Sequence, residues 1–240
     1  MNSLGLQKQD EIRIRLSQVR EHMNAALRTA GRPADSVTLI GVSKFFPPEY
    51  ALTAFQYGLS DLGENRVQEL LEKEAALQEQ NLYPNWHLIG TLQTNKVKQI
   101  VGHCDLIHSV SSLHLLEEIQ KVSAQKELVT NILLQVNISC EESKHGFARE
   151  EIDQAVFVAN GLTNVRVKGL MTMAPIQTEG QNPYIIFEQT ADLFQQLKSS
   201  VKDQKDWSVL SMGMSQDYID AIQCGATHIR VGTAIFGHRG

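Results

Sequence analysis

The sequence lacks the features of secreted and membrane-spanning proteins. Its three cysteines, Cys104, Cys140 and Cys224, lie far apart in 240 residues and form no CxxC pair, which is typical of unpaired thiols in a reducing compartment. No apolar run approaches the roughly 18 residues that a membrane span needs. The first stretch, "MNSLGLQKQDEIRIRL", mixes charged with apolar side chains and has no signal-peptide core. These absences predict a soluble cytoplasmic protein with no membrane partner.

Clustered positive charge and several catalytic motifs are also missing. The net charge is −5 and no run of lysine or arginine occurs, so no nucleic acid partner is predicted. The sequence has no P-loop, no glycine-rich dinucleotide motif after its first strand, and no paired carboxylates at the expected strand ends. His103, Cys104 and Asp105 are the only local group of metal-ligand types. Neighbours on a strand point to opposite faces, so no metal site is predicted.

What the sequence does contain is a regular alternation of two patterns. Ile12, Leu16, Val19, Met23 and Leu27 recur at helical spacing and predict an N-terminal helix over about residues 5–30. After it, short β-branched runs predict strands at 37–44, 59–63, 85–90, 106–110, 131–139, 165–173, 208–214 and 228–232. Helical periodicity between them predicts helices near 48–57, 65–80, 94–101, 112–126, 148–160, 184–202 and 216–223.

This alternation predicts an α/β fold built from parallel βαβ units. An open doubly wound sheet and a closed barrel both satisfy it, but a repeat of about 30 residues carried through eight units favours the (β/α)8 TIM barrel. No linker of altered composition interrupts the chain. We therefore expect residues 1–240 to form a single barrel domain with an extra N-terminal helix.

Two polar features stand at the expected C-terminal ends of the strands, where such barrels carry their sites. Lys44 follows the first strand in "VTLIGVSKFFPPEY". An isolated lysine there often only snorkels into water, but one that is partly desolvated at the barrel rim favours the neutral amine that attacks a carbonyl. Gly232 and Thr233 follow the eighth strand, where backbone N–H groups can cradle a phosphate or simply form a turn.

Lys44 and the Gly232–Thr233 turn together indicate one ligand site. In a closed barrel the first strand pairs with the eighth, which would place Lys44 beside the Gly232–Thr233 turn. The stretch "SMGMSQD" at 211–217 would add hydroxyl groups at the end of the seventh strand. A ligand with an aldehyde and a phosphate suits such a site. Pyridoxal 5′-phosphate and a phosphorylated sugar in a Schiff-base aldolase are both candidates.

At these residues the sequence resembles the YggS/PROSC family of pyridoxal phosphate homeostasis proteins, over nearly its whole length. The stretches that carry the resemblance are, in order, "GVSKFFPPE", "LGENRVQEL", "WHLIGTLQTNKVKQIV", "LLQVNISCEESKHGF", "GLMTMAP", "SMGMSQDYIDAIQCGATHIRVGTAIFG" and the closing "HRG". The resemblance implies one barrel like the N-terminal domain of bacterial alanine racemases. It differs at Phe45 and Phe46, where a polar or basic residue is more usual after the lysine, and these rings could alter the pocket mouth.

The resemblance also implies a cofactor site for pyridoxal 5′-phosphate. The cofactor would be attached to Lys44 as an aldimine, with its phosphate held by Ser215, Gly232 and Thr233. Arg230 would face the pyridine nitrogen, and Asn65 and Met173 would lie near the ring. His87 is a secondary candidate, whereas His108 and Cys104 are assigned to the core or rim.

The implied role is intracellular vitamin B6 homeostasis and amino/keto-acid balance, without an established catalytic activity. A charged Arg230 would keep the ring nitrogen unprotonated, which makes a poorer electron sink. The chain stops eight residues after Gly232, so the β-rich second domain of the racemases is expected to be absent and the cofactor open to solvent. A pyridoxal-phosphate-dependent racemase or Schiff-base lyase is the alternative. The resemblance favours a monomer, with pyridoxal-phosphate-dependent apoenzymes as candidate partners.

Overall fold

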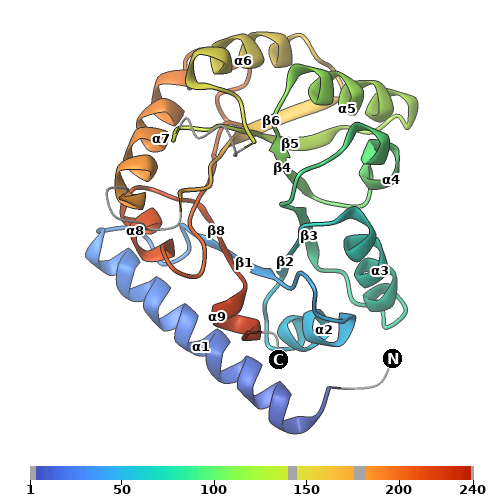
Figure 1. Ribbon diagram of the computed structural model, residues 1–240, viewed down its shortest axis with the longest axis vertical. Coiled ribbons are helices and arrows are strands. Elements are labelled where there is room, and N and C mark those ends of the chain that lie inside the picture. The colour runs from blue at the N-terminus through green and yellow to red at the C-terminus, as the bar shows by residue number, and fades with distance from the viewer. Residues whose placement is uncertain (1–3, 140–144, 176–181, 239–240) are drawn as a thin grey trace.

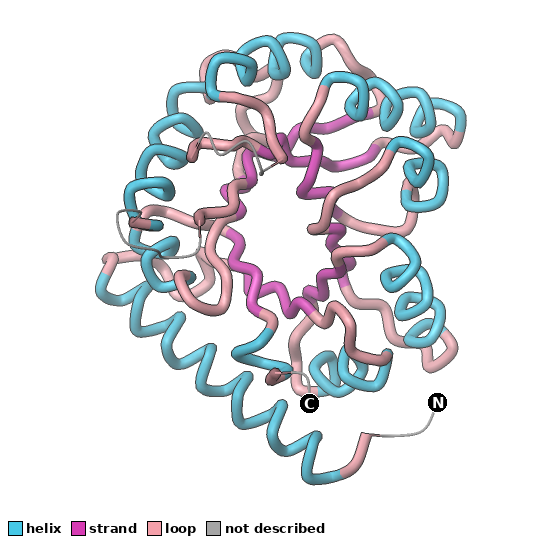
Figure 2. Tube along the Cα trace, viewed as in Figure 1, coloured by secondary structure: helices cyan, strands magenta, loops and turns pink. Residues whose placement is uncertain are grey.

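The chain forms a closed ring of parallel strands surrounded by helices, as a computed structural model shows (Figures 1 and 2). The structure describes residues 4–139, 145–175 and 182–238. Within these residues eight strands follow one another around the ring in sequence order, and the last pairs with the first. The strands are β1 (Thr38–Val42), β2 (Asp61–Glu64), β3 (Asn85–Leu88), β4 (Leu106–Val110), β5 (Thr130–Gln135), β6 (Val165–Met171), β7 (Val209–Ser211) and β8 (His228–Val231).

Helices cover the outside of this ring, as Figure 2 shows. They are α1 (Leu6–Thr29), α2 (Pro48–Gln56), α3 (Val67–Gln78), α4 (Val97–Ile100), α5 (Leu113–Gln125), α6 (Ile152–Asn160), α7 (Pro183–Leu197), α8 (Tyr218–Gln223) and α9 (Thr233–Phe236), with 3-10 turns η1 (Thr94–Lys96) and η2 (Arg149–Glu151). None of the helices in the described ranges is both long and apolar enough to cross a membrane. The predicted (β/α)8 barrel with an additional N-terminal helix is confirmed.

Several predicted strands end too late. The expected strands at 85–90, 131–139, 165–173 and 208–214 stop at residues 88, 135, 171 and 211. The residues beyond these points include Ile89 and Met173, which line a pocket. The Ile89 N–H still donates to the Glu64 carbonyl at 2.8 Å, although β3 ends at Leu88. An apolar residue in a strand and one in a pocket wall look alike in sequence, because both positions favour burial. The helix predicted at 94–101 is also shorter, since its first turn is η1.

The strand residues alternate between an outer and an inner surface, as the period of a β-strand requires. Outward residues such as Leu62, Leu88 and Ile229 belong to the main core between strands and helices. Two small clusters stand apart from that core and occupy the barrel interior: Ile40, Val42 and Ile89, and Leu106, Leu133, Met171 and Val209. Buried polar residues lie between these two clusters.

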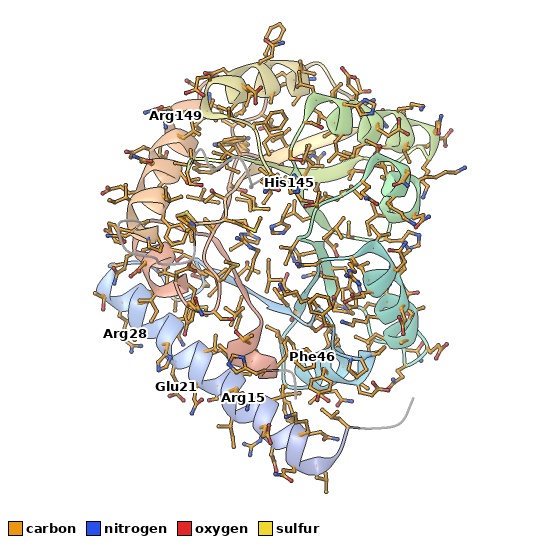
Figure 3. The ribbon with its side chains drawn as sticks, viewed as in Figure 1. Arg15, Glu21, Arg28, Phe46, His145 and Arg149 are labelled. Carbon is orange, nitrogen blue, oxygen red and sulfur yellow. The ribbon has the colours of Figure 1, made fainter. Side chains whose placement is uncertain are left out.

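Helix α1 runs along the outside of the barrel and packs against α8 and α9 (Figure 1). Ile12, Leu16 and Leu27 are almost completely buried on its inner side, and each contributes roughly 1.5–3 kcal/mol of burial free energy. The opposite side carries exposed charges such as Glu21 and Arg28 (Figure 3). The interface continues past the helix, because Arg32 donates hydrogen bonds of 2.7 and 2.8 Å to the carbonyl oxygens of Ile222 and Ala226.

The cysteine prediction can be checked at two of its three positions. Cys104 and Cys224 are free thiols. Cys140 lies outside the described residues, as do Arg239 and Gly240 of the closing "HRG". Among the described residues no group of three or more His, Cys, Asp or Glu side chains is placed to hold a metal ion.

Candidate functional site

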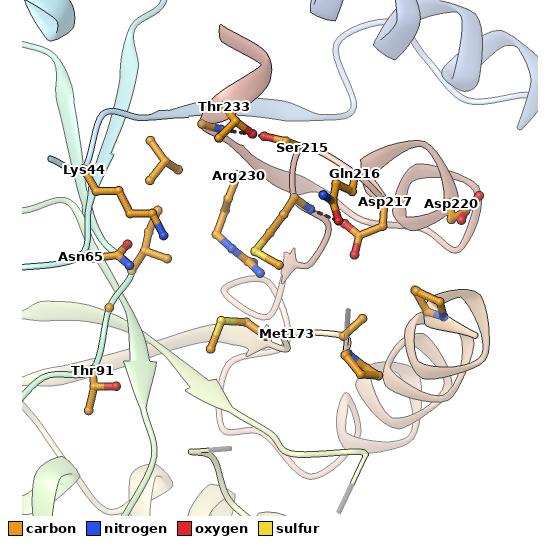
Figure 4. Close-up of a pocket in the computed structure, with 18 residues that line it drawn as sticks. Lys44, Asn65, Thr91, Met173, Ser215, Gln216, Asp217, Asp220, Arg230 and Thr233 are labelled. Carbon is orange, nitrogen blue, oxygen red and sulfur yellow. Dashed lines mark hydrogen bonds between the residues drawn. The ribbon is translucent and has the colours of Figure 1, made fainter. Parts of the chain in front are cut away.

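A cavity of about 430 Å³ opens at the C-terminal ends of the strands, a size that suits a small-molecule ligand (Figure 4). Its walls come from the segments that follow β1, β2, β3, β6, β7 and β8. All the cofactor-site residues expected from the sequence line this one cavity: Lys44, Asn65, Met173, Ser215, Arg230, Gly232 and Thr233. Parallel strands therefore bring together residues that are up to 189 positions apart, from Lys44 to Thr233 (233 − 44).

Lys44 reaches into the cavity from the end of β1 (Figure 4). The chain turns sharply behind it, because Phe45 has a φ of 69° and the Phe46 N–H donates to the Ser43 carbonyl at 3.0 Å. This turn ends the strand and lets α2 begin at Pro48. The expectation of a partly desolvated amine is wrong for this structure, since the Lys44 side chain is exposed. It is a lysine open to an incoming ligand.

A buried network holds the backbone directly before Lys44. Lys73 Nζ, on α3, donates to the Ser43 carbonyl at 2.8 Å and lies 2.5 Å from Glu64 Oε1. The Ser43 hydroxyl also donates to Glu64 Oε1, at 2.5 Å. Burial raises the pKa of Glu64, although the charge of Lys73 and its hydrogen bond act in the opposite direction. The network fixes the strand end from which Lys44 projects.

The sequence carries a signal for this network in α3. Lys73 occupies a buried position in the apolar stripe of α3, with Val67, Leu70 and Leu77. Lysine is almost never fully buried without a partner. A lysine in such a stripe therefore predicts a buried carboxylate nearby, and Glu64 at the end of β2 was the available candidate.

Two backbone N–H groups converge on one oxygen at the other side of the cavity. Gly232 N and Ala234 N donate to Ser215 Oγ, at 3.1 and 3.4 Å. Figure 4 shows Ser215 beside Thr233 at this point of the cavity. A side chain at position 232 would crowd the strand, because its Cβ would lie 3.0 Å from the carbonyl oxygen of Val42. Convergent amide N–H groups beside a hydroxyl are the donors that a phosphate oxygen takes in proteins. The residues present therefore fit the phosphate end of the expected cofactor.

Arg230 is buried and its guanidinium group faces the same cavity (Figure 4). Nη1 donates to Ser211 Oγ at 2.6 Å and Nη2 donates to the Thr172 carbonyl at 2.9 Å. Burial lowers the pKa of Arg230 to about 10, while the nearby Asp217 acts to raise it, so the group remains charged at neutral pH. Because both acceptors are neutral, the positive charge is available to an anionic or hydrogen-bond-accepting ligand.

Asn65 and Met173 form part of the wall between these groups. Asn65 lies so close to the next strand end that a Cβ on Gly90 would overlap its backbone carbonyl. Only glycine at position 90 permits this approach. Met173 packs against the inner cluster that contains Leu133 and Met171. The cavity thus has an apolar wall near the barrel axis and polar groups around its rim.

The cavity is also lined by residues that the sequence does not predict as part of the site. Asp217 lines it, and its Oδ1 accepts the Met214 N–H at 2.6 Å. Burial raises the pKa of Asp217, whereas the hydrogen bond from Met214 and the charge of Arg230 act against that rise. Figure 4 shows Asp217 and Asp220 on the side away from Lys44. Both stand in the stretch "SMGMSQDYID" with Ser215, but the sequence predicts a role in the site only for Ser215.

The secondary candidates lie elsewhere. His87 and His108 are buried in the barrel interior beneath the cavity, and their facing nitrogens are 3.0 Å apart. Cys104 lines a different surface hollow beside His103 and Trp86. The assignment of His108 to the core is confirmed, while His87 does not line the cavity.

Comparisons with known proteins agree on the family. The family model described as the alanine racemase N-terminal domain matches residues 14–240. Two curated relatives are named pyridoxal phosphate homeostasis protein. The one from Aquifex aeolicus is 40% identical over 94% of this chain and 97% of its own length, and the one from Escherichia coli (strain K12) is 34% identical over 96% and 97%.

Solved structures show the same relationship. PipY of Synechococcus elongatus, solved with PLP bound, is 33% identical and superposes with a TM-score of 0.82, covering 94% of this chain and all of that one. An alanine racemase of Clostridium difficile has a TM-score of 0.73 at 16% identity, and this chain covers 60% of its length. At that identity the likeness to the racemase shows the fold alone.

Proposed function

The chain belongs to the alanine racemase N-terminal domain family, together with the pyridoxal phosphate homeostasis proteins, and from this premise we propose that it binds pyridoxal 5′-phosphate and takes part in its homeostasis. The observation that carries the proposal is the composition of one cavity. An exposed lysine, a convergent pair of amide N–H groups and a buried arginine all face the same space. PipY, which is similar over its whole length, was solved with PLP bound.

Different residues of the cavity bind different parts of the cofactor. Lys44 is the point of attachment for the aldehyde, and its exposure leaves the amine accessible. Ser215, Gly232 and Thr233 hold the phosphate through the hydroxyl and backbone donors at the start of α9. When bound, pyridoxal phosphate supplies an aldehyde that reacts reversibly with amines and a pyridine ring that withdraws electrons.

Three further residues orient the ring. Arg230 would face the ring nitrogen as a permanent donor and so keep that nitrogen an acceptor at neutral pH. Asn65 and Met173, which line the cavity, would flank the ring. These seven residues make a site with one attachment point, one anion cradle and one fixed cation.

We propose that the protein holds and releases the cofactor instead of using it in catalysis. Racemisation needs an acid/base group on each face of the bound substrate. In the part of the chain that the structure describes, the cavity lining contains no tyrosine, histidine, cysteine or glutamate, and its two carboxylates, Asp217 and Asp220, lie on the side away from Lys44. Apoenzymes that depend on pyridoxal phosphate are the proposed recipients.

The remaining properties belong to the same proposal. Residues 1–240 act as one domain and as a monomer. The cytoplasm is the compartment we expect, because Cys104 and Cys224 are free thiols. Size-exclusion chromatography with light scattering at several concentrations tests the monomer, and a concentration-dependent mass near twice 26.8 kDa would contradict it.

The attachment point can be tested by reduction. Borohydride treatment of the cofactor-loaded protein followed by peptide mapping is expected to give a pyridoxyl-phosphate adduct on Lys44. The Lys44→Ala variant should lose the adduct, whereas Lys121→Ala, an exposed lysine on α5, should keep it. An adduct confined to another lysine, or none on loaded protein, would contradict the assignment of the site.

Catalysis can be tested separately by exchange. The loaded protein is incubated with L-alanine in D2O, and the α-deuterium content and the proportion of D-alanine are followed by NMR and chiral chromatography. We expect no exchange above the rate given by free pyridoxal phosphate at the same concentration. Fast deuteration with loss of chirality would replace the carrier by a racemase.

A further inference from the structure

A row of polar side chains crosses the barrel interior beneath the cavity. It begins at Arg230, whose Nη1 lies 2.6 Å from Ser211 Oγ, and Ser211 Oγ lies 2.9 Å from His108 Nδ1. It continues from His108 Nε2 to His87 Nδ1 at 3.0 Å, and from His87 Nε2 to Asp61 Oδ1 at 3.1 Å. We call Arg230, Ser211, His108, His87 and Asp61 the polar row. Each member lies on a different strand: β8, β7, β4, β3 and β2.

The two ends of the polar row determine the direction of every hydrogen bond in it. A guanidinium group only donates and an ionised carboxylate only accepts. Arg230 therefore donates to Ser211, and the Ser211 hydroxyl hydrogen is free to donate to His108 Nδ1. His108 then carries its proton on Nε2 and donates to His87, which in turn carries its proton on Nε2 and donates to Asp61. In this arrangement each histidine carries one ring proton, on Nε2, and the two have the same tautomer.

The surroundings reinforce this arrangement. His108 and Ser211 are fully buried, and apolar clusters lie on both sides of the row in the barrel interior. Burial lowers the pKa of His108 well below its ordinary value, and the charge of Arg230 acts in the same direction. Asp61 stands at the opposite end of the barrel from the cavity, where its side chain is 22% exposed. Hydrogen bonds from His87 and Asn85 lower its pKa despite its partial burial, which acts to raise it.

We propose that the polar row is a positioning device for the cofactor site: Asp61, His87, His108 and Ser211 hold the guanidinium group of Arg230 in the orientation in which it meets the ring nitrogen of pyridoxal phosphate. The inference rests on the proposed function for the identity of the ligand. It assigns a role to four residues that do not touch the cavity, and it couples the far end of the barrel to the site.

The coupling follows because, among the described residues, the side chains of Ser211, His108 and His87 have hydrogen-bond partners only within the row. If Asp61 loses its acceptor oxygen, the Nε2 proton of His87 loses its only acceptor in the described structure, and the alternative tautomer becomes favourable. A proton on His87 Nδ1 points at His108 Nε2, which must then give up its own proton and take one on Nδ1. Ser211 Oγ would accept from both Arg230 and His108, and its own hydrogen would have no acceptor. The change of tautomer thus weakens the hydrogen bond between Ser211 and Arg230.

The test uses the full chain and reads the row with and without cofactor. Nitrogen-15 NMR of the histidine rings reports the tautomers, and the Nη signals of Arg230 report how tightly its guanidinium group is held. We expect His87 and His108 to be neutral with the proton on Nε2, and the two Nη groups of Arg230 to give separate signals. In Asp61→Leu we expect mixed tautomers, averaged Nη signals, and an affinity for pyridoxal phosphate weaker by roughly tenfold.

Three variants separate positioning from general loss of structure. Asp61→Asn retains an acceptor oxygen and should restore the tautomers and most of the affinity. Asn85→Ala removes the other hydrogen bond to Asp61, of 3.1 Å, and should leave the row and the affinity unchanged. Ser211→Ala cuts the row next to Arg230 and leaves it the hydrogen bond to the Thr172 carbonyl, so the guanidinium group should be held less tightly even if Asp61→Leu does not fold.

Each outcome decides the proposal. A wild-type His108 that is protonated on Nδ1, or an Asp61→Leu variant in which Arg230 and the affinity stay as in Asn85→Ala, would overturn the positioning role. If the wild-type protein shows the expected tautomers but takes up no pyridoxal phosphate, the proposed function fails, and the role of the row toward that cofactor fails with it. The NMR and binding results therefore distinguish the two failures.

Discussion

Replacing Lys73 by methionine tests the buried network beneath the cofactor site. Methionine preserves most of the side-chain volume but removes the positive charge and the hydrogen bonds to Ser43 and Glu64. Glu64 is fully buried, and in the wild type its Oε2 already has no hydrogen-bond partner among the described residues. After the substitution only the Ser43 hydroxyl still donates to this carboxylate. Removing one partner of a buried ion pair costs about 3–5 kcal/mol of folding free energy.

The loss should depend on pH in a direction set by Glu64. Burial raises the pKa of Glu64 in the folded protein, and removing the opposing charge of Lys73 raises it further. A group with a raised folded pKa takes up a proton on folding, so its contribution to stability is present below the unfolded value of 4.5 and is lost as pH rises through the folded pKa. The deficit of Lys73→Met should therefore be larger at pH 7 than at pH 5.

Urea unfolding followed by circular dichroism at both pH values provides the measurement. The double variant Lys73→Met/Glu64→Gln removes both charges and should recover a large part of the loss at pH 7. Lys121→Met breaks an exposed ion pair with Glu118 and should cost less than about 1 kcal/mol. A deficit for Lys73→Met no larger than that of Lys121→Met, and equal at both pH values, would refute the buried ion pair.

Three further predictions concern single positions. Gly90→Ala forces a Cβ into the backbone of Asn65, so we expect a lower midpoint of thermal unfolding together with weaker binding of pyridoxal phosphate; an unchanged midpoint would contradict the close approach. Ser215→Ala removes the oxygen on which the Gly232 N–H converges, and fluorescence titration should show affinity for pyridoxal phosphate lower by about tenfold with little change in stability. His228 has its pKa lowered from 6.5 to about 4 by burial, with the charge of Arg230 acting in the same direction and that of Asp61 against it. Its neutral form is therefore favoured on folding, and stability should fall as pH drops from about 6.5 to 4. In His228→Gln that dependence should be smaller by up to about 1.4 kcal/mol per pH unit, and an identical dependence would show that His228 is not buried as a neutral group.

The barrel could be predicted from the sequence because its periodicities are local. Ile12, Leu16, Val19 and Met23 mark α1 at helical spacing, and "VTLIGV" marks β1, without reference to any other part of the chain. The closed form of the barrel was predicted from the number of strand–helix units and from their spacing along the chain. The ends of the strands were less accurate, because Ile89 and Met173 line the cavity, and an apolar residue in a cavity wall looks like one in a strand.

The sequence predicts which strand ends carry the site, but it does not predict the hydrogen bonds between side chains inside the barrel. Lys44 and Gly232 are recognisable because the first and last strands of a closed barrel must be neighbours. The polar row required more information, since His87, His108 and Ser211 meet across the barrel interior only when strand register and tilt are known. The sequence period places each of them inside the barrel, yet it does not tell which inward residue faces which. Contacts across the axis are a property of the closed ring.

The packing of α1 against α8 and α9 has a consequence for the order in which the protein can be made. Arg32 reaches the carbonyl of Ile222, 190 positions further along the chain, so α1 leaves the ribosome long before its docking surface has been synthesised. Until then α1 can pack against α2 but not against α8 and α9. The same delay applies to β1, which pairs with β8 only at closure. We therefore expect the nascent chain to lack the contacts of α1 with α8 and α9 and the pairing of β1 with β8 until late in translation. During that interval it should depend on chaperones that protect exposed apolar surfaces from aggregation.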